Sequence, residues 1–280
     1  MTHYGMVFDL NKCQHCYNCQ LACKDEYVAN DWPPYSAAQP DMGQFWMHLV
    51  ERERGTFPKV KVSRVPTPCM QCTNPPCVGA STGGAVYKRP DGIVIIDPKL
   101  STGQRNIQTA CPYGVIYWND TLSIPQKCTM CAHLLDRGTG WQPRCVDACI
   151  TGAITWGDLD DSNSDIAKLV ATGTPQPLNP EFGVKPNVFY INIPKTFLAG
   201  TVVDKASDEC FEGANVTLTD VASGTTRTTT TNNYGDFEFE GLDSGKVYSL
   251  SISATGYTTI TQNSIPLNTD TYLGNLFLSK

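Results

Sequence analysis

The chain of 280 residues has a hydrophobic content of 41% and a charged content of 17%, values typical of a globular protein with one large or two modest domains. Its net charge of -6 argues against a nucleic-acid partner, and no apolar run approaches the roughly eighteen residues of a membrane helix. The first residues contain neither an apolar signal core nor a twin arginine, so we expect a cytoplasmic protein, exported only alongside a partner that carries a signal.

All of the 13 cysteines except Cys210 precede residue 150, and they follow regular spacings in chain order. The stretch "NKCQHCYNCQLACKDE" at 11–26 contains C-x2-C-x2-C-x3-C. The next group contains C-x2-C-x4-C and a separate "CP", and the last contains C-x2-C-x13-C-x3-C. These twelve thiols divide into three sets of four, and a [4Fe–4S] cluster requires four thiolates.

Closely spaced cysteines occur in disulfides, structural zinc sites and iron–sulfur clusters. Disulfide frameworks are typical of small secreted chains without an adequate core, which this chain does not resemble. A zinc site usually combines two separated C-x2-C pairs. In contrast, x2, x2 and x3 spacing within one run is typical of bacterial ferredoxins. We therefore predict iron–sulfur clusters, with a zinc scaffold as the alternative.

In the ferredoxin spacing, three cysteines bind one cluster and the fourth binds a neighbouring cluster. Cys23 and Cys149 each follow a third cysteine after three residues, so we expect these two ligands to be exchanged between clusters. The predicted ligand sets are Cys13, Cys16, Cys19 and Cys149 for the first cluster, Cys23, Cys128, Cys131 and Cys145 for the second, and Cys69, Cys72, Cys77 and Cys111 for the third.

Because the first two sets exchange ligands, their clusters should lie close together, and the third should extend the pair into a row that conducts single electrons. Lys24 and Lys127 each stand beside a predicted ligand, where a positive charge would raise a cluster potential. We interpret both as ordinary solvated lysines.

The segment 32–55 is rich in aromatic residues and prolines and contains a cluster of arginine and glutamate. This composition suits either a contact with a partner protein or a cover for the core, and we favour the contact. The candidate anchors are Trp46, Arg52 and Arg54.

After residue 156 the chain changes character. Residues 157–195 are polar and broken by prolines, which predicts a connecting segment, and residues 196–280 contain seven alternating stretches rich in Thr, Val, Ile and aromatic residues. In "DFEFE", Phe237 and Phe239 should point to one side and the glutamates to the other. We predict an α+β protein with a cluster-binding domain at 1–156 and a C-terminal seven-stranded β-sandwich, in which Cys210 is buried or half-buried.

The stretches "VFDLNKCQHCYNCQLACKDE", "PTPCMQCTNPPCVGAS" and "QKCTMCAHLLDRG" resemble the iron–sulfur electron-transfer subunits of molybdopterin oxidoreductases of the dimethyl-sulfoxide-reductase family. The resemblance covers roughly residues 4–156 and implies a bacterial-ferredoxin-like fold. Typical members bind four clusters, but here the positions expected for four of their cysteines hold Ser81, Ser101, Gln104 and Ile107. One whole cluster site is therefore expected to be missing.

With its added β domain and the stretches "WMHLVERERGTFP" and "ECFEGANVTL", the chain is similar over nearly its full length to the small subunits of the pyrogallol–phloroglucinol transhydroxylase family. That resemblance implies a heterodimer whose large subunit carries a molybdenum bis-pterin guanine dinucleotide and acts on phenols, with no catalytic residue in this chain. Subunits of catechol dehydroxylases or other molybdopterin oxidoreductases are the alternative, and a free ferredoxin-like carrier is less favoured. The β domain also resembles the transthyretin-like folds of carboxypeptidase regulatory domains.

Overall fold

The computed structural model describes residues 2–280, which form two compact units. The first unit combines Met1–Val50 with Arg64–Ile193, and the second combines Glu51–Ser63 with Pro194–Lys280. These bounds differ from the predicted segments, because most of the expected connection belongs to the first unit and part of the N-terminal half belongs to the second. Strands predominate in the described residues, and the helices are short.

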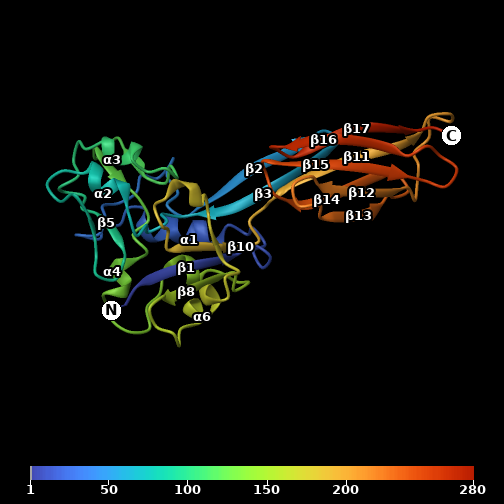
Figure 1. The fold of residues 1–280 in the computed structure, drawn as a ribbon. Helices are drawn as coiled ribbons and strands as arrows, with labels where there is room; N and C mark the ends of the chain where they lie inside the picture. The colour runs from blue at the N-terminus through green and yellow to red at the C-terminus, as the bar shows by residue number, and fades with distance from the viewer. Residues whose placement is uncertain (1) are drawn as a thin grey trace. The chain divides into compact units, whose positions relative to one another are not determined.

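A four-stranded sheet runs through the first unit in the order β8–β1–β10–β9 (Figure 1). Its strands are β1 (Tyr4–Asp9), β8 (Ile154–Asp158), β9 (Gln176–Pro177) and β10 (Val188–Ile191). Strand β1 is parallel to β10, with Met6 opposite Val188, and antiparallel to β8. The consecutive residues Met6, Val7 and Phe8 are each at most 1% exposed, so β1 is buried on both faces as a central strand.

Short helices and two-stranded hairpins form much of the rest of the first unit. The helices are α1 (Asn18–Tyr27), α2 (Pro76–Ala80), α3 (Asn106–Thr109), α4 (Ala132–Leu135), α5 (Arg144–Asp147), α6 (Asp165–Ala171) and the 3-10 helix η1 (Pro180–Phe182). The hairpins are β4 (Val86–Lys88) with β5 (Val94–Ile96) and β6 (Tyr117–Asn119) with β7 (Ile124–Gln126). Helix α1 packs against α5. No helix in the described residues combines the length and the apolar character needed to cross a bilayer.

The segment 32–55 covers part of the core of the first unit. Trp46 is 1% exposed, and its ring centre lies 4.6 Å from that of the equally buried Tyr27. The prediction that Trp46 anchors a partner was therefore wrong, because an indole in this position stabilises the fold through its own buried area.

The second unit contains two sheets, with the strand orders β14–β11–β17 and β13–β12–β15–β16 (Figure 1). The strands are β11 (Thr196–Asp204), β12 (Asn215–Asp220), β13 (Thr226–Thr230), β14 (Asp236–Leu242), β15 (Lys246–Ser253), β16 (Ile260–Leu267) and β17 (Thr271–Leu278). The predicted alternation in β14 is confirmed, since Phe237 and Phe239 are 2% and 3% exposed while Glu240 is exposed. Side chains of both sheets, including Leu198 and Leu250, meet in one apolar core.

A hairpin of β2 (His48–Thr56) and β3 (Lys59–Thr67) contributes Glu51–Ser63 to the second unit. Within this unit, Arg54 forms a two-point ion pair with Asp270, with Nε 2.9 Å from Oδ2 and Nη2 2.7 Å from Oδ1. The two side chains are only 18% and 10% exposed. The prediction that Arg54 contacts a partner was therefore wrong, because its guanidinium is already bound within the chain.

We expect Arg54→Ala to lower the free energy of unfolding by about 3 kcal/mol, because it leaves the mostly buried Asp270 carboxylate without its counter-charge. Arg52→Ala removes an exposed arginine from the same strand and should change that free energy by less than about 0.5 kcal/mol. Urea denaturation followed by circular dichroism measures both effects. Equal losses in the two variants would contradict this account of the ion pair.

Candidate metal centres

The first predicted ligand set surrounds one cavity where the loop after β1 meets the loop before β8. The four cysteines that line it are Cys13, Cys16, Cys19 and Cys149. The N–H of Asp9, at the end of β1, donates to the carbonyl of Ala153, just before β8, at 2.8 Å. This antiparallel pairing brings Cys149 back to the N-terminal loop. Cys16 is exposed and the other three thiols are half-buried, so this set is the most open of the three.

The second predicted set, Cys23, Cys128, Cys131 and Cys145, is buried. Cys23 lies on α1 and Cys145 on α5, and the two helices pack together. The thiols of Cys128 and Cys131 act electrostatically on both Cys23 and Cys145. Burial is the main effect that raises the pKa of Cys128 to about 12 and that of Cys131 to about 11. Such thiols stay protonated until a cation compensates their charge.

The third predicted set lines a second cavity, formed by Cys69, Cys72, Cys77 and Cys111. The first two cysteines follow β3, Cys77 lies on α2, and Cys111 follows α3. Burial and then the neighbouring thiols raise the pKa of Cys72 to about 12. The structure thus brings the isolated Cys111 to the C-x2-C-x4-C motif, which lies far from it in the sequence.

One backbone conformation recurs in the first C-x2-C pair of each cysteine group. The residue before the second cysteine is His15, Gln71 or Met130, with φ of 55°, 46° or 53°. This left-handed conformation costs a residue other than glycine about 1 kcal/mol, so it persists only where the surroundings impose it. It turns backbone N–H groups toward a common point that suits negatively charged groups. Accordingly, the N–H of Met130 donates to Sγ of Cys128 at 3.3 Å.

The donor chemistry of these sets fits iron–sulfur clusters. Each set offers four soft sulfur ligands, and backbone N–H groups donate to some of them. The N–H of Met47 donates to Cys23, and Cys111 accepts from Tyr113, Gly114 and Val115. Hydrogen bonds to sulfur help to determine a cluster's potential. Within residues 2–280, no three His, Cys, Asp or Glu side chains lie close enough together to hold a single metal ion.

The three sets are neighbours in a definite order. Cys19 of the first set acts electrostatically on Cys23 and Cys145 of the second. Cys69 of the third set acts on Cys128 of the second. The second set is therefore a neighbour of both of the others.

Two family models match the chain: the 4Fe-4S dicluster domain at residues 60–159 and the carboxypeptidase regulatory-like domain at residues 198–275. The pyrogallol hydroxytransferase small subunit of Pelobacter acidigallici is 42% identical over 266 residues, which cover 91% of this chain and 92% of that protein. The chain belongs to the iron–sulfur subunits of the dimethyl-sulfoxide-reductase family.

Other members of this iron–sulfur subunit family are more distant. The arsenate respiratory reductase iron–sulfur subunit of Shewanella sp. (strain ANA-3) is 34% identical over 235 residues, covering 67% of this chain and 95% of that protein. One subunit of the sulfite dehydrogenase of Allochromatium vinosum is 34% identical over 210 residues, covering 70% of this chain and 85% of that protein. The relatives confirm the predicted family, and the two family models confirm an iron–sulfur part followed by a β domain.

The four positions at which the resemblance implies ligands of a further cluster adjoin an apolar cluster. The positions that would supply ligands are Ser81, Ser101, Gln104 and Ile107. The Gln104 side chain accepts from the N–H of Thr82 at 2.8 Å and donates to its carbonyl at 3.2 Å, directly beside Ser81. Ser101 and Ile107 lie one turn before and after Gln104, since the N–H of Gln104 donates to the Ser101 carbonyl and that of Ile107 to the Gln104 carbonyl. Ile107 is 0% exposed and packs in an apolar cluster with Val86, Ile96 and Ile116.

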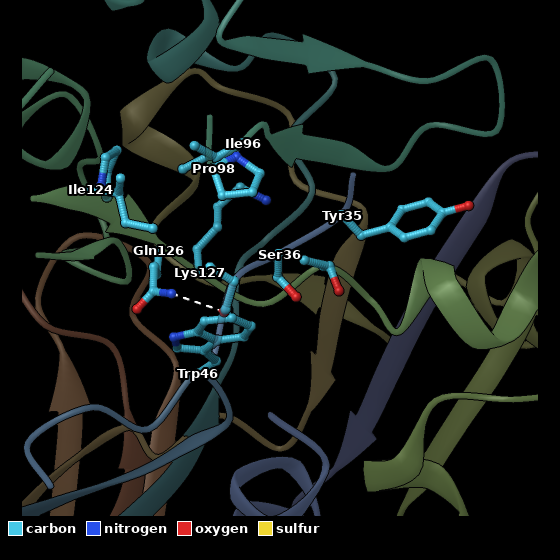
Figure 2. Close-up of a pocket in the computed structure, with 11 residues that line it drawn as sticks. Tyr35, Ser36, Trp46, Ile96, Pro98, Ile124, Gln126 and Lys127 are labelled. Carbon is cyan, nitrogen blue, oxygen red and sulfur yellow. Dashed lines mark hydrogen bonds between the residues drawn. The ribbon is translucent and has the colours of Figure 1, made fainter. Parts of the chain in front are cut away.

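The interpretation of Lys127 as a solvated lysine was wrong. This side chain is 2% exposed. It lines a small cavity, where Figure 2 shows it between Trp46 on one side and Ile96 on the other. Lys24, the other lysine beside a ligand, is half-buried and donates to the carbonyl of Gln44 at 3.2 Å.

Cys210 joins none of the three sets. Its backbone forms an isolated bridge with Val203, and its side chain is exposed. The expectation of a buried or half-buried thiol was therefore wrong, because the residue lies in a connection at the edge of the strands instead of within one.

Proposed function

We propose that this chain is the electron-transfer subunit of a molybdenum enzyme that moves a hydroxyl group between the phenols pyrogallol and phloroglucinol. The main support is the arrangement of twelve thiols in three neighbouring sets of four. The 42% identity to the pyrogallol hydroxytransferase small subunit supports the substrate class. Each set would hold one [4Fe–4S] cluster, and such clusters exchange single electrons.

In this proposal, the residues of this chain hold the clusters, insulate them and fix their orientation. In the proposed assignment, Cys13, Cys16, Cys19 and Cys149 bind the first cluster, Cys23, Cys128, Cys131 and Cys145 the second, and Cys69, Cys72, Cys77 and Cys111 the third. We assign no catalytic residue here. The active site, with a molybdenum bis-pterin guanine dinucleotide, would lie on a large partner subunit in a heterodimer. The exposed Cys16 makes the first set the most accessible to that partner.

The second unit would have a supporting role. We assign it a seven-stranded transthyretin-like sandwich that stabilises or docks the complex. The match to a carboxypeptidase regulatory-like domain supports this fold, which does not by itself indicate a ligand.

A second candidate is a subunit of a catechol dehydroxylase or another molybdopterin oxidoreductase. It is favoured by the relatives named as an arsenate respiratory reductase subunit and a sulfite dehydrogenase subunit, whose reactions involve net electron flow. A transhydroxylation has no net redox change. Counting the electrons taken up from a reduced dye per turnover of the purified complex separates the two candidates.

Anaerobic purification of the native complex tests the proposal. We expect a brown preparation with about 12 iron and about 12 sulfide ions per copy of this chain, at constant stoichiometry with a larger molybdenum-containing chain. A colourless, zinc-containing preparation would support the zinc scaffold instead. An iron-loaded chain that purifies alone would support a free carrier.

A further inference from the structure

Lys127 is a buried ammonium group in contact with two of the three ligand sets. It lies between the last residue of β7 and Cys128, and it is 2% exposed. Its Nζ donates to the carbonyl oxygens of Val94 and Cys128, the latter at 3.1 Å. It also lines the same cavity as Cys69, Cys72 and Cys77 of the third set. The side chain thus reaches from a residue beside the second set to a ligand of the third.

Lys127 lies close to residues of both sets, because its Nζ donates to the carbonyl of Cys128 and the side chain lines the cavity of the third set. The thiols of Cys69, Cys77 and Cys128 each favour the positive charge of this buried side chain. In return, the lysine charge opposes the rise in pKa that burial imposes on Cys72, Cys77 and Cys128. Cys128 belongs to the second set and the others to the third, so a single positive charge acts on both sets.

A buried charge requires a balancing charge nearby, because it has lost its hydration. A four-thiolate cluster carries one more negative charge when it is reduced than when it is oxidised. In surroundings of low dielectric constant, a positive charge beside its sulfur ligands therefore stabilises the reduced form more than the oxidised form. We propose that Lys127 raises the reduction potentials of the second and third clusters together through its buried positive charge. This inference rests on the three clusters of the proposed function.

Two substitutions at this position separate the charge of Lys127 from its role as a hydrogen-bond donor. Lys127→Gln removes the charge and retains an N–H donor for the Val94 carbonyl, whereas Lys127→Arg retains both charge and donors. Lys99→Gln is the matched control, because it removes the charge of an exposed lysine from the same unit.

The measurement is an anaerobic redox titration of the whole complex, followed by electron paramagnetic resonance of the reduced clusters. We expect Lys127→Gln to shift two of the three midpoint potentials to lower values and to leave that of the first cluster in place. Lys127→Arg and Lys99→Gln should leave all three midpoints close to those of the unmodified protein.

The tuning role is overturned if Lys127→Gln retains its iron with unchanged midpoints, or if Lys99→Gln produces the same shift. If Lys127→Gln loses iron while Lys127→Arg keeps it, the charge serves cluster assembly and the tuning role is again wrong. Loss of iron from both variants would show a packing role only. A failure of the proposed function would differ from a failure of the tuning role, because the unmodified protein itself would then lack iron and sulfide.

Discussion

Cys111→Ala is expected to lower the iron content from about 12 to about 8 per chain, because it removes one ligand of a single proposed cluster. Cys111 is isolated in the sequence but lines the same cavity as Cys69, Cys72 and Cys77. The other two sets surround different places in the first unit, so their clusters should remain. Iron analysis measures the loss, and electron paramagnetic resonance shows which signals are left.

A matched pair of variants tests the grouping more sharply. Cys145 and Cys149 are separated by only three residues, yet they belong to the second and first proposed sets. Cys145→Ala and Cys149→Ala should therefore remove different resonance signals. Cys210→Ala, which alters an exposed cysteine outside every set, should retain all of the iron. Loss of the same cluster in both members of the pair would show that the assignment of ligands is wrong.

A quadruple variant is expected to raise the iron content from about 12 to about 16 per chain. The substitutions are Ser81→Cys, Ser101→Cys, Gln104→Cys and Ile107→Cys. These positions are close in the fold, because Gln104 bonds to Thr82 beside Ser81 and backbone hydrogen bonds join Ser101, Gln104 and Ile107. Replacing the buried Ile107 opens space among its apolar neighbours, and a bound [4Fe–4S] cluster would fill that space.

The control for this gain retains isoleucine at position 107. The triple variant provides only three of the four thiols, so its iron content should stay close to about 12 per chain. If the quadruple variant also remains at that level, the chain no longer bends round a usable site. Its stability in the iron-free form, measured by thermal unfolding, should fall because the large apolar side chain is lost.

Local spacing predicted the groups of cysteines that the structure brings together. A C-x2-C motif limits the backbone so strongly that its two thiols must share a neighbourhood. The x3 spacing predicts that Cys23 and Cys149 are exchanged between clusters, and this stays a prediction. The alternation of Phe237 and Glu238 could also be predicted from the sequence, because it depends only on the two-residue period of a single strand. Both inferences rest on residues close together in the chain. The identity of the bound group stays a prediction.

Features that depend on distant partners could not be read from the sequence. The burial of Lys127 depends on Val94 and Cys69, which are far from it in the chain. Arg54 pairs with Asp270, which lies near the other end of the sequence. The left-handed residue at Gln71 has no compositional signal, because tertiary surroundings and not intrinsic preference determine its conformation.

The apolar side chains around Ile107 close one end of the proposed row of clusters to electron transfer. Cys77 of the third set belongs to this apolar cluster and Cys111 packs against it, whereas Cys16 of the first set is exposed. Electrons that enter there would have to return by the same route. The subunit would then store up to about three electrons for its neighbour and would not conduct electrons between two proteins.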